Sequence, residues 1–176
     1  AAGGSFAHWR ELARDVLPHA AWNTALLLAG VGLMVTVIGA GCAWLVTAFD
    51  FPGRRIFDWA LLLPLAMPTY IVAFAYLDLL HPLGPVQGAL RWMLGLDSPR
   101  DLRLPDMRSM GGAIFLLGSV LYPYVYMTAR AMFITQPAHL MEAARTLGAG
   151  PVAAFFQVAL PMARPALAVG VSLALM

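Results

Sequence analysis

The segment WNTALLLAGVGLMVTVIGAGCAWLVTAF (residues 22–49) decides the fold class, because no charged residue occurs from Trp22 until Asp50. The hydrocarbon core of a bilayer is crossed by about 20 apolar residues in a helix. Working outward, two more segments, 59–77 and 109–129, are equally free of charge. Glycine and alanine recur in these segments, as expected where membrane helices pack closely. The sequence therefore predicts an all-α, polytopic transmembrane helix bundle.

The domain organisation follows from these apolar segments. Residues 1–20 show no signal-peptide pattern, and we expect a lead segment there. The last apolar run is too short to cross a bilayer, so we expect the chain to be a fragment. The remainder is one partial transmembrane domain, 21–176. Its predicted parts are spans at about 22–49, 59–80 and 109–131, the start of a fourth at 165–176, and a loop at about 135–164.

The composition excludes several classes of protein. Charged residues make up 11% of the chain, whereas soluble domains contain about 25%. The net charge is +2 and no basic run occurs, so nothing indicates nucleic acid as a partner. The lone cysteine, Cys42, allows neither a disulfide framework nor a set of cysteine metal ligands. We expect no cofactor and no metal centre.

The stretch TQPAHLMEAARTLG (residues 135–148) carries most of the functional information. Pro137 is well placed to begin a helix and Gly148 to end it. A second short helix, from Pro151 to Pro161, is predicted in place of a further span. The residues that share one face of the first helix are Leu140, Ala143, Ala144 and Leu147. Small side chains on this face would let another surface approach closely.

The spacing in this loop resembles the EAA loop of type I ABC importer permeases. Glu142-Ala143-Ala144 is followed after three residues by Gly148, and after nine more by Val158-Ala159-Leu160-Pro161. Only Val158 departs from the family pattern, which has isoleucine there. The resemblance implies that residues 135–164 are a coupling loop that fits a groove on an ATPase. Carried over by position, its residues are Glu142, Ala143, Ala144, Arg145, Leu147, Gly148, Leu160 and Pro161.

The resemblance also implies partners and a mechanism of alternating access. A periplasmic solute-binding protein would deliver the substrate, and separate ABC ATPase subunits would hydrolyse ATP. This chain is not expected to be an enzyme, because a Walker A motif needs a lysine and the sequence has none. A second permease half, fused or separate, would complete the pathway in the lipid bilayer of the bacterial inner membrane.

The implied orientation follows from the coupling loop. If that loop faces the cytoplasm, residues 81–108 and the lead segment face outward. Charged and apolar residues alternate irregularly in 81–108, so we expect part of it to lie along the membrane interface as a short helix.

Three short stretches look most similar to the ferric iron permeases within this family. They are FPGRR (51–55), LPLAMP (63–68) followed by Tyr70, and AYLD (75–78). This similarity implies ferric iron as the substrate. Sulfate, thiamine and polyamines are the alternatives, because permeases for these compounds share related turns.

Three side chains are candidates for the translocation path. Asp78 follows the second apolar segment, where an ionisable residue is either functional or the interfacial end of the helix. Tyr122 and Tyr126 flank Pro123, and their oxygen atoms would suit a hard ferric ion. The alternative for the tyrosines is aromatic packing in a kinked helix.

Two other classes of protein stay open at the level of sequence. An intramembrane hydrolase would use Ser119 with His81 or His139 as the base, although Gly118-Ser119 is not a recognised nucleophile turn. A membrane scaffold or signalling protein would have no need of the coupling-loop pattern.

Overall fold

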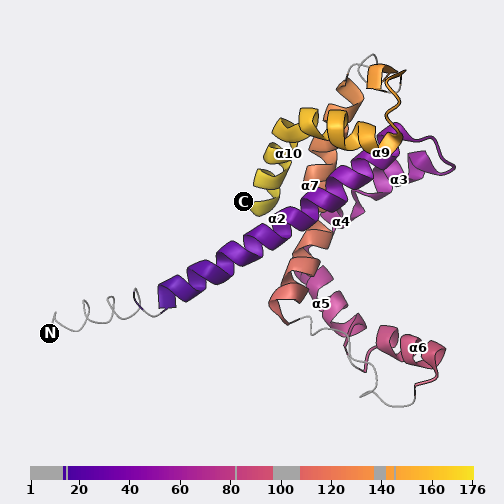
Figure 1. The fold of residues 1–176 in the computed structure, drawn as a ribbon. Coiled ribbons are helices and arrows are strands. Elements are labelled where there is room, and N and C mark those ends of the chain that lie inside the picture. Colours follow the sequence, from indigo (N-terminus) through magenta and orange to yellow (C-terminus); the bar gives the residue numbers. More distant parts are fainter. Residues whose placement is uncertain (1–13, 15, 82, 97–107, 137–141, 145) are drawn as a thin grey trace.

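The computed structural model describes residues 14, 16–81, 83–96, 108–136, 142–144 and 146–176, and these residues form helices and no strand. The predicted all-α membrane fold is therefore confirmed. In chain order, the elements of Figure 1 are α2 (Leu17–Ala48), α3 (Arg54–Ala60), α4 (Leu63–Ala66), α5 (Thr69–Leu79), α6 (Pro85–Leu94), α7 (Met110–Thr135), α9 (Pro151–Ala154), η2 (Phe155–Ala159) and α10 (Leu160–Leu175).

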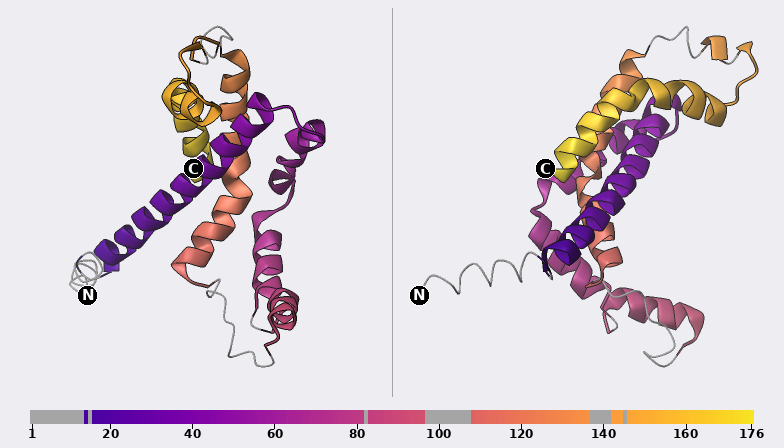
Figure 2. Two further views of the ribbon diagram at one scale, coloured as in Figure 1. Left: turned by 45° about the vertical axis from the view of Figure 1, so that its right-hand side comes forward. Right: turned by 60° about the vertical axis from the view of Figure 1, so that its left-hand side comes forward.

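Among the described residues, three helical segments are long and apolar enough to cross a membrane. They are Leu17–Ala48 with 32 residues, Met110–Thr135 with 26 residues, and Pro151–Leu175 with 25 residues. At about 1.5 Å per residue, each is longer than the ~30 Å hydrocarbon core. Helices α2, α7 and α10 pack against one another and form what we call the three-helix core (Figures 1 and 2).

Small residues allow the helices of the three-helix core to approach closely. A Cβ atom added at Gly39 would lie 2.8 Å from Val125 Cβ and 2.9 Å from the backbone nitrogen of Tyr126. A Cβ atom at Gly170 would lie 2.8 Å from Val125 Cα. The side chains with no exposed surface around these contacts are Val35, Ala43, Val125, Ala129, Ala159 and Ala163. Close packing of small residues is how membrane helices gain van der Waals contact without a hydrophobic driving force.

The second predicted span is bent rather than straight. The axis turns by 97° between Arg54–Ala66 and Thr69–Leu79. Pro64 contributes no N–H to the helix, and Pro68 takes an extended ψ of 128° immediately before α5. We call α3, α4 and α5 together the bent segment. If the bent segment counts as one crossing, the described residues contain up to four spans.

The last helix differs from the sequence prediction of a short helix ending at Pro161. Residues Pro151–Leu175 form one continuous helical segment. Its residues Phe155–Ala159 form a π-turn, which loosens the regular hydrogen-bond ladder just ahead of Pro161. Pro161, which has no N–H to donate, lies shortly after this π-turn inside the continuous segment. The proline therefore changes the local winding and does not end the helix.

Helix α6 lies at the opposite end of α7 from the coupling loop (Figure 1). It runs across the direction of α7 in Figure 1 and in the right-hand view of Figure 2. Gln87 is 1% exposed and its Nε2 donates to the carbonyl oxygen of Leu80 at 2.9 Å, which fixes α6 to the end of α5. The short helix expected within 81–108 is present, and its position in a membrane stays a prediction.

Candidate functional site

The coupling loop contains a helical turn that ends at a glycine. The Leu147 N–H donates to the carbonyl oxygen of Ala143 at 3.1 Å, and the Ala149 N–H donates to that of Ala144 at 3.0 Å. Gly148 has a φ of +84°, a left-handed conformation that only glycine adopts without steric cost. The turn therefore stops where the sequence predicts.

This turn presents an exposed surface. Leu147 is 88% exposed, whereas Ala144 is 8% exposed and faces inward. Glu142, Ala143 and Gly148 are all exposed. An open hollow of about 510 Å³ lies between the turn and α9, lined mostly by alanine, glycine and valine. The turn therefore presents a hollow of small residues with one large apolar side chain, Leu147, exposed beside it.

The base of the coupling loop is fixed to the three-helix core. The Nε2 of Gln136, directly after α7, donates to the carbonyl oxygen of Ala159 at 3.0 Å. The ring centroid of Trp44 on α2 lies 5.6 Å from that of Phe133 on α7 and 5.3 Å from that of Phe155 on η2. These aromatic contacts join three elements at one end of the fold, so the loop has a rigid base.

The residues predicted for the coupling loop therefore divide between its exposed surface and its half-buried base. The exposed members are Glu142, Ala143, Leu147 and Gly148. Leu160 and Pro161 are half-buried in the first turn of α10, at the base of the loop. Arg145 and the expected helix start at Pro137 lie outside the described residues.

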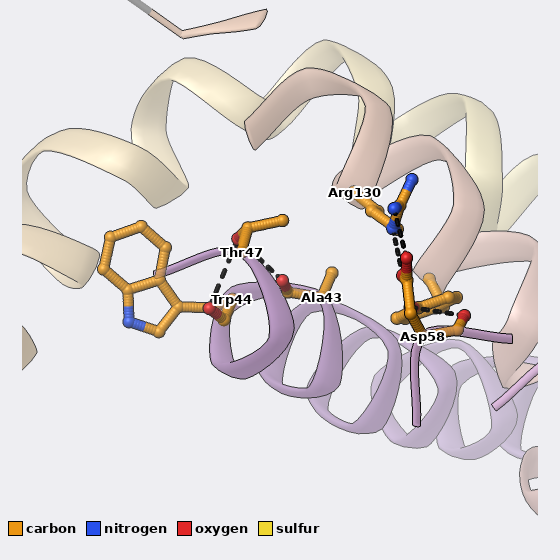
Figure 3. A network of polar contacts seen from close by, with 6 residues as sticks. Ala43, Trp44, Thr47, Asp58 and Arg130 are labelled. Carbon is orange, nitrogen blue, oxygen red and sulfur yellow. Dashed lines mark hydrogen bonds and ion pairs between the residues drawn. The ribbon is translucent and has the colours of Figure 1, made fainter. Parts of the chain in front are cut away.

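A second polar site joins the bent segment to α7. Arg130 donates from Nε and Nη2 to the two carboxylate oxygens of Asp58, a bidentate ion pair whose side chains are 35% and 31% exposed. The Tyr126 hydroxyl lies 2.9 Å from Asp58 Oδ1 and 3.0 Å from the Asp58 carbonyl oxygen. Figure 3 shows Arg130 and Asp58 turned toward each other. Bidentate, charge-assisted contacts of this kind are strong and directional.

The turn between α3 and α4 displaces two backbone hydrogen bonds near Asp58. In a regular helix the Leu62 N–H would donate to the Asp58 carbonyl, and the Leu65 N–H to the Leu61 carbonyl. Here the Leu62 N–H donates to the Trp59 carbonyl at 3.0 Å, and the Leu65 N–H to the Leu62 carbonyl at 3.0 Å. The Asp58 and Leu61 carbonyls therefore need other donors, since unpaired backbone groups are costly in a membrane.

Two tyrosines of α7 supply these donors. The Tyr122 hydroxyl donates to the Leu61 carbonyl at 2.9 Å, and the Tyr126 hydroxyl reaches the Asp58 carbonyl. Tyr122, Tyr126 and Arg130 are four residues apart and so lie on one face of α7. We call these three side chains, with Asp58 and the Leu61 carbonyl, the polar ladder.

Sequence reasoning missed the polar ladder. Asp58 and Arg130 border the charge-free segments 59–77 and 109–129, and they are 72 residues apart in the chain. The four-residue spacing of Tyr122, Tyr126 and Arg130 was the available signal, because it puts three polar groups on one face of an otherwise apolar helix. Nothing in the sequence identified Asp58 as their partner.

The residues of the polar ladder and of the coupling loop lie within the part of the chain that matches a known protein family. Residues 35–176 match the family described as "Binding-protein-dependent transport system inner membrane component". The chain belongs to this permease family. Its curated relatives are permeases of several transport systems, and the chain spans about half the length of most of those it matches.

Three of these permeases illustrate the range of transport systems among the relatives. The sulfate transport system permease protein CysW of Escherichia coli is 31% identical over 93% of this chain and 53% of its own length. The diacetylchitobiose uptake system permease protein NgcG of Streptomyces coelicolor is 27% identical, over 83% of this chain and 41% of its own. The molybdenum transport system permease protein ModB of Escherichia coli is 28% identical, over 90% and 68%.

The residues predicted for the translocation path of the permease do not form one cluster. Tyr122 and Tyr126 direct their hydroxyl groups to the bent segment, as members of the polar ladder. Asp78 is exposed in the last turn of α5, beyond the 97° bend, and is not part of the ladder. Within the described residues, no group of three or more His, Cys, Asp or Glu side chains could bind a metal ion.

The residues considered for hydrolysis have other contacts in the permease. The Ser119 hydroxyl donates to the carbonyl oxygen of Leu116 in its own helix at 2.9 Å. The Nδ1 of His81 accepts from the Leu83 N–H at 3.2 Å, and His139 lies outside the described residues. The geometry therefore gives no support to a hydrolase, and family membership points to a transport subunit.

Proposed function

We propose that this permease domain works in an ATP-driven importer of the bacterial inner membrane that receives its substrate from a periplasmic binding protein. Separate ABC ATPase subunits hydrolyse ATP, and a second permease half, fused or separate, completes the pathway. The observation that carries the proposal is the glycine-terminated turn of the coupling loop, with Leu147 88% exposed beside it. Membership of the permease family supports the same role.

The coupling loop suits a docking role because its tip is exposed and its base is fixed. Leu147 offers an apolar side chain to a partner groove, while Ala143 leaves room for a close approach. Gln136 and the ring of Phe133 connect the loop to the end of α7. Docking shifts the permease between outward and inward states only if the ATPase binds those states with different affinity.

The relatives favour a tetrahedral oxyanion as the substrate over the ferric iron predicted from the sequence. Permeases named for sulfate and molybdenum match 93% and 90% of the chain. The hydroxyl groups of Tyr122 and Tyr126, which were the candidate ligands for iron, bind the bent segment instead. We therefore propose sulfate or molybdate as the substrate, and ferric iron, thiamine and polyamines are the compounds to test against them.

The test is radiolabelled uptake by cells that express the full-length permease with its neighbouring subunits. Sulfate, molybdate, ferric iron, thiamine, a polyamine and diacetylchitobiose are compared in parallel. The variant Gly148→Asp is expected to insert normally but to lose at least about 90% of uptake and of substrate-stimulated ATP hydrolysis. A side chain at φ +84° strains the turn, and the added carboxylate alters the docking surface.

Gly95→Asp is the matched control. Gly95 also has a positive φ, +67°, at the end of α6, and a Cβ atom added there, as at Gly148, would have no neighbouring atom within 4 Å. The same chemical change therefore introduces comparable strain at the other end of the fold, and uptake should persist. Normal uptake in Gly148→Asp would contradict docking at this loop. If the wild type takes up a compound other than sulfate or molybdate, and Gly148→Asp loses that uptake, the mechanism stands and the oxyanion substrate is rejected.

A further inference from the structure

Within the bent segment, α3 is attached to α7 by polar contacts, whereas α5 also has a ring contact between Tyr76 and Phe115. None of residues 54–79 is fully buried, whereas α2, α7 and α10 each contain fully buried residues. An open hollow of about 310 Å³ lies beside Asp58 and Arg130, between α3 and α7. Side-chain packing therefore fixes the position of α3 only weakly. The polar ladder supplies the directional contacts.

Helix α7 connects the polar ladder to the coupling loop. Arg130 lies near the end of α7, which stops at Thr135, and Gln136 follows directly. From Arg130 to Gln136 the distance along a helix axis is about 9 Å. Gln136 is hydrogen-bonded to Ala159 at the base of the coupling loop. A displacement of the loop therefore reaches Arg130 through less than two turns of helix.

The contacts at Asp58 resist both sliding and rotation. The guanidinium of Arg130 meets both carboxylate oxygens, which fixes its plane as well as its distance. The Tyr126 hydroxyl reaches the same residue from the next turn of α7. Two side chains on one helix face thus bind one residue of α3. When that face of α7 moves, α3 has to follow or the contacts break.

We propose that Asp58, Tyr126 and Arg130 form a joint that passes movement of the coupling loop to the bent segment during transport. The inference rests on the proposed function, because it needs an ATPase that moves the loop. The joint stays closed through the transport cycle, so that α3 moves with the end of α7. The three side chains are positioning residues, since their contacts are with one another and not with a substrate.

A second ion pair on α3 provides a matched control. Arg54 pairs with Asp50, four residues earlier, and this contact stays within the turn between α2 and α3. Asp50 is 93% exposed, compared with 31% for Asp58. Loss of the Arg54 pair removes a charge and a local ion pair from α3, but leaves its attachment to α7 unchanged.

The experiment uses the complete importer, with full-length permease, ATPase and binding protein, in proteoliposomes. The readout is substrate taken up per ATP hydrolysed, normalised to assembled complex. Arg130→Gln is expected to lower this ratio about tenfold, because ATP is still hydrolysed while the movement no longer reaches α3. Arg54→Gln should leave the ratio unchanged. The exchanged pair, Asp58→Arg with Arg130→Asp, should recover part of the loss.

Tyr126→Phe keeps the inference testable if Arg130→Gln does not assemble. It removes one hydroxyl group from a ring that is 1% exposed, and the ratio should fall about fivefold. The proposed joint is rejected if Tyr126→Phe gives a wild-type ratio and Arg130→Gln either gives a wild-type ratio or does not assemble. The importer function would remain intact in that case. A wild-type complex without ATP-dependent uptake of any compound would overturn both.

Discussion

The three-helix core and the bent segment are attached in opposite ways. In the core, glycine and alanine bring backbones together, and Val35, Val125 and Ala163 have no exposed surface. In the bent segment no residue is fully buried, and its hydrogen bonds to α7 come from two hydroxyl groups and one guanidinium. One ring contact, between Tyr76 and Phe115, adds to them. One region is fixed by many dispersed contacts and the other by a few directional ones.

This difference separates stability from movement. A close-packed core transmits displacement because it does not deform continuously. A segment attached by a few polar contacts can keep its contacts while its remaining surface slides past neighbours. We therefore expect substitutions in the core to change stability most, and substitutions in the polar ladder to change coupling most.

The largest difference in unfolding free energy between the two regions should come from removing one phenylalanine ring from each. Phe133 is 7% exposed and contacts the rings of Trp44 and Phe155, whereas Phe74 in the bent segment is 72% exposed. Phe133→Ala should lower the free energy of unfolding by about 3 kcal/mol or more, because it leaves a cavity. Phe74→Ala should change it by less than about 0.5 kcal/mol. Denaturant unfolding of the full-length chain in detergent measures both, and similar losses would contradict the contrast.

An intermediate effect is expected from adding one methyl group to α2. A Cβ at Gly39 would lie 2.8 Å from Val125 Cβ and 3.0 Å from the Tyr122 carbonyl oxygen, so α2 and α7 would have to separate. Gly39→Ala should cost about 2 kcal/mol. Gly41, on the same helix, has open space at this position, and Gly41→Ala should be neutral or stabilising by up to about 1 kcal/mol. If thermal midpoints shift equally in the two variants, the close approach is not what stabilises the core.

The smallest effect should come from a hydroxyl of the polar ladder. Tyr122→Phe removes the donor to the Leu61 carbonyl and should cost about 1 kcal/mol, because that carbonyl loses its partner while the ring still packs. Tyr124→Phe makes the same change two residues away, where the hydroxyl forms no hydrogen bond within the described part of the chain, and should be silent. The pair is compared by unfolding in detergent. A larger loss in Tyr124→Phe would reverse the assignment of the contact.

The sequence was sufficient to predict the fold class and the turn of the coupling loop. Charge-free segments longer than a bilayer crossing predict membrane helices on hydropathy alone, and α2 and α7 lie where two of these segments were placed. Gly148 could be predicted as a helix stop because a positive φ is a local property of the backbone. These features depend on neighbours within a few residues.

Features that depend on distant neighbours were not predictable. The last helix continues through Pro161 by way of a π-turn, which residue preferences do not predict. The pairing of Asp58 with Arg130 required knowing how α3 lies against α7, which are far apart in the chain. The substrate could not be predicted from the sequence either, because related permeases with 27–31% identity are named for chemically different compounds.

The tyrosine contacts at the bend have a thermodynamic consequence for changes in the shape of the segment. The carbonyl oxygens of Asp58 and Leu61 each have two available donors, a backbone N–H in a regular helix and a hydroxyl of α7 in this one. Straightening the segment would not be an isodesmic exchange, because the Tyr122 hydroxyl would lose its acceptor and Pro64 has no N–H for the Ala60 carbonyl. The present shape therefore has an enthalpic advantage, and differential binding energy at a remote surface would have to exceed it to straighten the segment.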